Sequence, residues 1–142
     1  DIDLNHMPDM VQTLAVAALF ASSRTIIRNV GNLRIKETDR LAALQCELTK
    51  LGSAVEIDGD DLIIDPPPDG RIKAAAIDTY NDHRMAMCFA MLGLAVAGIR
   101  LRNPSCVKKT FPNFFQKFAG ELGAEIRDAE GNVLEGEDLF AE

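Results

Sequence analysis

The sequence lacks several features that would assign it to a special class of protein. Its 142 residues hold only three cysteines, none in a Cys-x-x-Cys pair, so we expect neither a zinc site nor a disulfide framework and favour a reducing compartment. No apolar run approaches the roughly 20 residues that cross a bilayer, so no membrane partner is expected. No basic segment precedes an apolar run near Asp1, so we expect no signal peptide.

An excess of positive charge is also missing. The formal net charge of −7 argues against nucleic acid as a partner. The charge is uneven, however, because residues 24–40 are rich in arginine and lysine whereas residues 121–142 are strongly acidic. An acidic chain with a local basic cluster fits a small anionic ligand. The first residue is not Met and stands in the middle of a pattern, so we expect a fragment of a longer protein.

The sequence is best interpreted as two copies of one unit of about 70 residues. Arg-Asn and Leu-Gly dipeptides recur in the same order, at residues 28–29 and 51–52 and again at 102–103 and 122–123. Ordinary alternation of helices and strands is the alternative, but the nearly constant offset favours duplication. The first repeat is expected at about residues 1–65 and the second at about 74–135. A proline-rich linker separates them, and an acidic tail that we expect to fray, 136–142, follows.

Each repeat is predicted to be helix–strand–helix–strand–strand with a strand before it, which makes the fold class mixed α/β. In the first repeat a helix opens at Pro8, a strand covers residues 25–30, and a second helix opens at residues 36–38 and stops at Gly52. The turn at residues 58–61 predicts a hairpin. The second repeat has a helix from residue 81, a strand at 99–103 and final strands at 124–127 and 132–134.

Polar clusters stand at three of the predicted helix starts, where free backbone N–H groups favour anionic ligands. In the first, Asp9 follows Pro8. It is either an ordinary N-cap, which the segment taken alone favours, or a general base at the mouth of a helix. In the second, Lys36 and Arg40 are four residues apart and would share a helix face, where an anion could sit between them. A solvated first turn, relieved by Asp39, is the alternative.

The third cluster, Asp82, His83 and Arg84, lies where an otherwise apolar helix begins. Polar side chains at such a point need partners. A lone histidine is usually structural, but a histidine beside an arginine at a helix start is more specific. Lys108 and Lys109 form a fourth, weaker basic point.

These clusters resemble the signatures of the 5-enolpyruvylshikimate-3-phosphate synthase family. Residues 32–40 match Asn-x-Arg-[Val/Ile]-Lys-Glu-[Ser/Thr]-Asp-Arg, and residues 80–87 match Tyr-Asn-Asp-His-Arg-Met-Ala-Met without a break. Asn-His-Met-Pro-Asp at residues 5–9 and Lys-Thr-Phe-Pro at residues 109–112 also match in order. The resemblance covers most of the chain.

The resemblance implies a transferase that moves the enolpyruvyl group of phosphoenolpyruvate to the 5-hydroxyl of shikimate 3-phosphate and releases phosphate, on the route to chorismate and aromatic amino acids. Neither a metal nor an organic cofactor takes part in that reaction. The resemblance implies that Asp9 is the base and that Glu37 is the proton donor to the methylene carbon. It also implies that His83 lies near Glu37 and adjusts the acidity of that carboxyl group. The remaining implied contacts are Arg40, Arg84 and Lys109 with phosphoenolpyruvate, and Asp9, Asn32 and Lys36 with shikimate 3-phosphate.

The family fold is an inside-out α/β barrel with two similar domains of three βαβαββ repeats each, and the active site lies between them. By this resemblance the chain holds two repeats of the C-terminal domain and lacks the N-terminal domain, so it should not turn over alone. A missing repeat should expose an apolar helix face and favour self-association. The implied location is the cytoplasm, or a plastid for a plant protein. A non-catalytic anion-binding or interaction module and a UDP-N-acetylglucosamine enolpyruvyl transferase are the alternatives.

Overall fold

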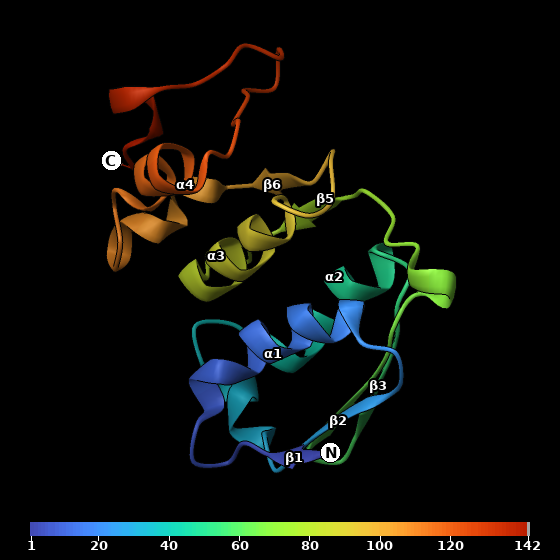
Figure 1. The fold of residues 1–142 in the computed structure, drawn as a ribbon. Coiled ribbons are helices and arrows are strands. Elements are labelled where there is room, and N and C mark those ends of the chain that lie inside the picture. The colour runs from blue at the N-terminus through green and yellow to red at the C-terminus, as the bar shows by residue number, and fades with distance from the viewer. Residues whose placement is uncertain (142) are drawn as a thin grey trace.

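Three helices of the chain lie between a four-stranded sheet and a two-stranded sheet (Figure 1). The computed structural model describes residues 1–141. Its helices and strands in chain order are β1 (Ile2–Asp3), α1 (Val11–Ala17), β2 (Thr25–Arg28), α2 (Arg40–Lys50), β3 (Ala54–Asp58), β4 (Asp61–Asp65), β5 (Ala76–Asp78), α3 (His83–Leu92), β6 (Arg100–Arg102) and α4 (Phe114–Leu122). Short 3-10 turns connect several of them, including one at Pro8–Met10 before α1 and one at Gly31–Ile35 before α2.

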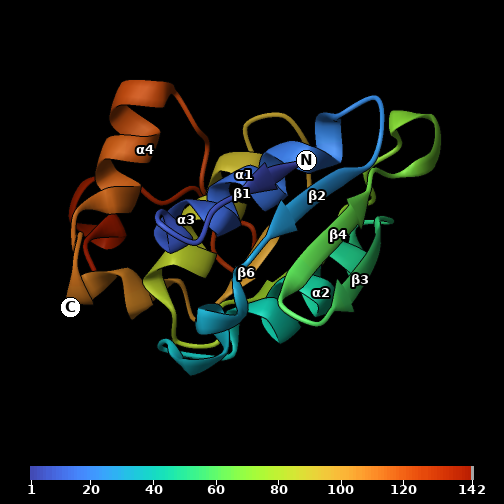
Figure 2. The same ribbon diagram turned by 90° about the horizontal axis from the view of Figure 1, so that it is seen from below.

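The larger sheet has the strand order β1-β2-β4-β3, with β1 parallel to β2 and the other neighbours antiparallel. Asp58 pairs with Asp61, so Gly59 and Asp60 form a two-residue turn and the predicted hairpin is confirmed. Figure 2 shows β2, β4 and β3 side by side with α2 against one face. Because side chains alternate along a strand, Leu62 and Ile64 of β4 face that helix and are buried.

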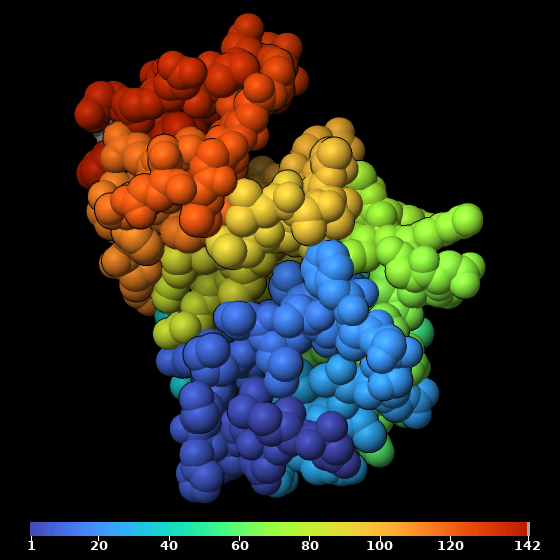
Figure 3. Space-filling view, viewed as in Figure 1, coloured from blue at the N-terminus to red at the C-terminus, as the bar shows by residue number. Residues whose placement is uncertain are grey.

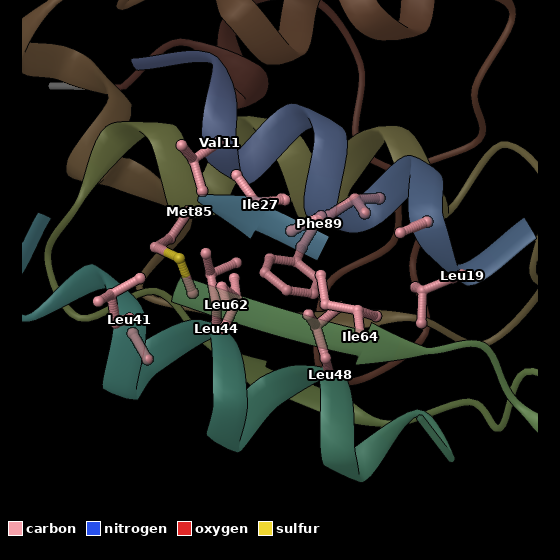
Figure 4. Close-up of a cluster of buried hydrophobic side chains, with 14 of the residues drawn as sticks. Val11, Leu19, Ile27, Leu41, Leu44, Leu48, Leu62, Ile64, Met85 and Phe89 are labelled. Atoms are coloured by element: carbon pink, nitrogen blue, oxygen red, sulfur yellow. The ribbon is translucent and has the colours of Figure 1, made fainter. Parts of the chain in front are cut away.

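The main core lies between the larger sheet and helices α1, α2 and α3 (Figure 4). Leucines at helical spacing on α2 form one wall, and α3 contributes Met85 and Phe89 from the opposite side. The labelled side chains of this core are Val11, Leu19, Ile27, Leu41, Leu44, Leu48, Leu62, Ile64, Met85 and Phe89. This packing brings the first turns of α1, α2 and α3 to the same end of the core.

The two halves of the chain share local backbone features as well as element order. The parallel pair β1–β2 has its counterpart in the parallel pair β5–β6. Asn29 and Asn103 each follow the second strand of a half and each has a positive φ, 60° and 53°. Gly52 and Gly123 end α2 and α4 with φ of 100° and 69°, a conformation that favours glycine. These matches support duplication, while the repeat boundaries near 1–65 and 74–135 stay a prediction.

The predicted start of the second helix at residues 36–38 is wrong. Lys36 has an extended backbone, and α2 begins only at Arg40. Asp39 explains the difference, because its side chain accepts a hydrogen bond from the backbone N–H of Ala42 at 3.1 Å and caps the helix there. Lys36 therefore does not share a helix face with Arg40.

The two final strands predicted at 124–127 and 132–134 are also wrong as strands. A single bridge, Arg127 with Val133, joins them around a turn in which Asp128 accepts bonds from two backbone N–H groups. In the first half, β4 pairs with β2 as well as with β3. Within residues 1–141 no third strand pairs with the later hairpin, and isolated two-stranded hairpins are marginal.

The expected fraying of the acidic tail is wrong over residues 136–141, and residue 142 lies outside the described residues. Leu139 and Ala141 are buried in a second apolar cluster with Phe115 and Phe118 of α4. The N–H of Ala141 also donates to the carbonyl of Pro112 at 2.9 Å. Figure 3 shows this C-terminal segment, in red, standing above the rest of the visible face.

An apolar groove runs beside α1 and α3 and is lined by Phe20, Met91 and Phe114, among others. Phe20 and Met91 are about half exposed, at 56% and 47%. This is an exposed apolar helix face of the kind that the sequence predicts. Within residues 1–141, no helix is long and apolar enough to cross a membrane.

Candidate functional site

Arg40 is the centre of a charged cluster at the first turns of α1, α2 and α3. Its side chain is only 1% exposed, yet its guanidinium meets three carboxylates. Nε lies 2.7 Å from Oδ2 of Asp82, Nη2 lies 2.7 Å from Oε2 of Glu37, and Nη1 lies 3.3 Å from Oδ1 of Asp9. Burial of a guanidinium is tolerated only with such partners. The three carboxylates therefore compensate the buried charge of Arg40 at this end of the core.

Asp9 links Arg40 to Arg84. Its second oxygen, Oδ2, accepts from Nη2 of Arg84 at 3.0 Å, and Nη1 of Arg84 also reaches the Asp9 carbonyl at 3.3 Å. No side-chain cap hydrogen bond is made by Asp9, which lies within the 3-10 turn before α1. The N-cap alternative for Asp9 is therefore wrong, and its carboxylate is directed to the two arginines.

Glu37 links Arg40 to Lys109. Oε1 of Glu37 lies 3.2 Å from Nζ of Lys109, which comes from the loop before α4. A hydrogen bond from its own backbone, followed by Lys109 and Arg40, lowers the pKa of Glu37 to about 2 and outweighs the opposite effect of burial. Glu37 is consequently an anion at neutral pH in this arrangement.

Local sequence fixes where these side chains stand. Asp39 caps α2, so Arg40 becomes the first residue of the helix and turns inward. Asp82 caps α3 by accepting from the backbone N–H of Arg84 at 2.8 Å, and the same carboxylate pairs with Arg40. One acidic side chain therefore joins the starts of two helices that are 42 residues apart in sequence.

The remaining candidate residues lie around this cluster without joining it. His83 is 7% exposed and follows Asp82, but its Nδ1 has no hydrogen-bond partner. Within residues 1–141, no hydrogen bond or ion pair connects His83 with Glu37, so their expected proximity stays a prediction. Asn32 and Lys36 lie exposed in the loop before α2, and neither side chain makes a hydrogen bond or ion pair within the described part of the chain.

Asp82 is the member of the cluster to which the sequence analysis gave no role. It is fully buried and holds Arg40 through two hydrogen bonds of 2.7 and 3.3 Å. The signal for it was present, because a polar triplet at the start of an apolar helix needs partners. Its partner could not be named, since Arg40 belongs to a different repeat.

The cluster balances three carboxylates, from Asp9, Glu37 and Asp82, against three cations. Among residues 1–141 no group of three or more histidine, cysteine or acidic side chains is arranged to hold a metal ion. The exposed members, Arg84 and Lys109, have exposed fractions of 35% and 64% and can exchange their carboxylate partners for an external anion. Arginine and lysine suit phosphate and carboxylate groups, so the chemistry on offer is anion binding next to two carboxylates.

Comparison with known proteins gives this cluster a family context. The family described as EPSP synthase (3-phosphoshikimate 1-carboxyvinyltransferase) matches residues 1–118. The 3-phosphoshikimate 1-carboxyvinyltransferase of Shewanella baltica is 55% identical over 123 residues, covering 87% of this chain and 28% of that protein. The enzyme of the same name from Nitrosomonas europaea is 55% identical over 120 residues, covering 84% of this chain and 27% of its own length.

A solved structure supports the same relationship. The EPSP synthase from Acinetobacter baumannii superimposes with a TM-score of 0.71 at 29% identity, over 80% of this chain and 27% of that one. The mixed α/β architecture is thus the fold seen in that enzyme, in agreement with the predicted fold class. The chain spans about 28% of the length of the curated relatives it matches. On the strength of the match over residues 1–118, the chain belongs to the EPSP synthase family.

Proposed function

We propose that this chain supplies the phosphoenolpyruvate side of an active site that transfers an enolpyruvyl group to the 5-hydroxyl of shikimate 3-phosphate and releases phosphate. The observation that carries the proposal is the convergence of Asp9, Glu37, Arg40, Arg84 and Lys109. These five residues come from four separate segments of the chain, yet hydrogen bonds and ion pairs connect them into one cluster. The family match supports assigning this reaction to the cluster.

In this proposal the cations hold phosphoenolpyruvate. Arg40 is fixed by Asp82 and presents a guanidinium edge, while Arg84 and Lys109 close on the phosphate and carboxylate groups from two further elements. Their present partners are carboxylates, and an incoming anion would replace them. Bidentate arginine contacts would then orient the substrate.

The two displaced carboxylates would do the proton transfers. Asp9 would take the proton from the 5-hydroxyl while the hydroxyl oxygen bonds to the central carbon of phosphoenolpyruvate. Glu37 would give a proton to the methylene carbon to form a tetrahedral ketal, which would then return one methyl proton to Glu37 and expel phosphate to leave the enolpyruvyl ether. A pKa of about 2 does not suit a proton donor. A bound anion beside Glu37 would occupy Lys109 and Arg40 and raise that pKa, so substrate itself would prepare the acid.

The other implied residues complete the proposal. Asn32 and Lys36 are exposed ahead of α2 and would contact the shikimate moiety, and His83 would sit near Glu37 after substrate binds. The N-terminal domain that the resemblance implies would supply the remaining phosphate contacts. A cytoplasmic location, or a plastid in a plant, stays a prediction.

One alternative has an observation in its favour. A chain covering about 28% of its relatives could act as an anion-binding or interaction module without turnover. It would keep the arginines for binding and have no use for Asp9 and Glu37 as proton carriers. The matched family and relatives carry the 3-phosphoshikimate name, and no observation favours a UDP-sugar acceptor.

Titration of phosphoenolpyruvate into the chain, followed by NMR, tests the anion site. Lys109→Met removes one charged contact, so we expect affinity to fall about tenfold. Lys117→Met is the matched control, because the Lys117 side chain pairs with Glu121 on the exposed face of α4, and this change should leave affinity unchanged. Equal affinities for the two variants, or no saturable binding by the unchanged chain, would contradict the proposal.

A further inference from the structure

A second buried carboxylate, outside the cluster, belongs to Glu47 in the middle of α2. It is fully buried and accepts three hydrogen bonds or ion-pair contacts. Nζ of Lys50 lies 2.7 Å from Oε2, the hydroxyl of Tyr80 donates to Oε1 at 2.8 Å, and the backbone N–H of Asp78 donates to Oε2 at 3.2 Å. A buried carboxylate is tolerated only when its oxygens are bonded in this way. Two of the three donors belong to one short segment, residues 78–80.

That segment leads into a backbone turn that non-glycine residues rarely adopt. Tyr80 and Asn81 have φ of 56° and 54°, both in the left-handed region. Two consecutive residues of this kind persist only where the surroundings hold them. On one side, the hydroxyl of Thr79 donates to the carbonyl of Arg102 at 2.8 Å. On the other side, the Tyr80 hydroxyl is held by Glu47.

The turn ends at Asp82, the carboxylate that fixes Arg40. Asp82 also accepts the backbone N–H of Arg84, so its position sets the start of α3 as well. Glu47 and Arg40 lie on the same helix, α2, seven residues or about two turns apart. The Tyr80–Asn81 turn is consequently attached to α2 at two points, Tyr80 to Glu47 and Asp82 to Arg40.

We propose that Glu47 is a positioning residue for the anion site. Acting through the Tyr80 hydroxyl, it holds the left-handed turn that places Asp82 against Arg40 and directs Arg84 toward Asp9. Glu47 makes no contact with the anion itself. The hydrogen bond between the Tyr80 hydroxyl and Glu47 is called the clamp below. This inference rests on the proposed function, since it assigns the clamp to the same cluster. If the clamp served stability alone, loosening it would destabilise the chain without changing how the arginines bind an anion.

Tyr80→Phe is the cleanest perturbation of the clamp. It removes only the hydroxyl, and because Tyr80 is 38% exposed the ring can stay in place. Inorganic phosphate is the probe, titrated into the 142-residue chain and followed by NMR, with urea unfolding measured in parallel. We expect affinity for phosphate to fall about threefold to tenfold, which corresponds to part of one charge-assisted hydrogen bond. The Nε–H resonance of Arg40 should also move in the ligand-free protein.

Two further variants separate positioning from stability. Ser53→Ala removes a hydrogen bond from the Ser53 hydroxyl to the carbonyl of Asp65, just beyond the other end of α2. It should lower stability without affecting phosphate affinity or the Arg40 resonance. Glu47→Gln combined with Tyr80→Phe should weaken binding no more than the more harmful single change, because both act through one bond.

The results that would overturn the inference are distinct from failure of the proposed function. The inference is overturned if Tyr80→Phe and the unchanged chain have the same phosphate affinity and the same Arg40 Nε–H resonance. It is also overturned if the losses of phosphate affinity in the two single variants add up in the double variant. If the unchanged chain shows no saturable binding, the proposed anion site fails. The clamp is then judged by the Arg40 resonance, and an unmoved signal in Tyr80→Phe overturns it too.

Discussion

Replacement of Asp82 by asparagine tests whether the buried Arg40–Asp82 pair holds the three helix starts together. Asparagine caps helices about as well as aspartate, so the bond from the Arg84 N–H is kept. The charge opposite Arg40 is removed, and the amide NH2 that replaces one carboxylate oxygen cannot accept the hydrogen bond from Arg40 Nε. The side chains of Arg40 and Asp82 are 1% and 0% exposed, so solvent cannot replace the lost partner.

The magnitude follows from what Arg40 retains. Removal of one partner from a buried ion pair costs about 3–5 kcal/mol in general. Arg40 keeps Glu37 at 2.7 Å and Asp9 at 3.3 Å, so its charge is still partly compensated. We therefore expect a loss of about 2–3 kcal/mol in the free energy of unfolding. With a urea m-value of about 2 kcal/mol/M, the unfolding midpoint should fall by about 1–1.5 M.

Urea unfolding followed by circular dichroism measures this shift. Asp65→Asn is the matched control, because Asp65 pairs with Arg24 on the surface, where the two side chains are 39% and 56% exposed. An exposed pair contributes at most about 1 kcal/mol, so the control midpoint should fall by no more than about 0.5 M. Equal shifts in the two variants would refute the claim that burial makes the Arg40–Asp82 pair structurally decisive.

Three further predictions concern the core, the end of a helix and the stability at low pH. Phe89→Ala should cost about 3–5 kcal/mol in urea unfolding, because Phe89 is fully buried among α1, α2 and β4. Gly52→Ala should lower the thermal midpoint, since φ of 100° strains any side chain there; an unchanged midpoint would contradict this. The lowered pKa of Glu37 contributes stability that is full above about pH 4.5 and is lost as pH falls through about 2. In Glu37→Gln, the free energy of unfolding should depend less on pH in this acid range. An unchanged pH dependence would contradict this role of Glu37.

The fold could be predicted well where apolar periodicity and turn residues agree. The leucines of α2 recur at helical spacing, and the Gly59-Asp60 turn lies between two short apolar strands, so both elements are confirmed. The start of α2 was missed because Lys36, Glu37 and Thr38 are compatible with a first helical turn. The decisive fact is the Asp39 cap, which is visible only in the fold.

The last hairpin shows a different limit. Residues 124–127 and 132–134 have the same alternation as β3 and β4, and local propensity cannot tell them apart. Pairing with a third strand decides the outcome. β4 has β2 beside it, whereas β6 pairs only with β5 among the described strands.

The candidate site could be predicted only with help from the family resemblance. Periodicity put Asp9, Arg40 and Arg84 near helix starts, but it could not say that Asp9 would bridge the two arginines. The roles of Asp9 and Glu37 as proton carriers stay predictions. Glu47 carried no signal at all, because a glutamate in a helix is ordinarily exposed and its burial depends on Tyr80 from the other repeat.

Phosphate release by a chimera tests the central claim most directly. The matched stretch of the Shewanella baltica enzyme, 28% of its length, is replaced by this chain, and the chimera is given phosphoenolpyruvate with shikimate 3-phosphate or with UDP-N-acetylglucosamine. We predict release with shikimate 3-phosphate alone, and its loss in the chimera with Asp9→Asn. No release from a folded chimera, or full release with Asp9→Asn, would contradict the account.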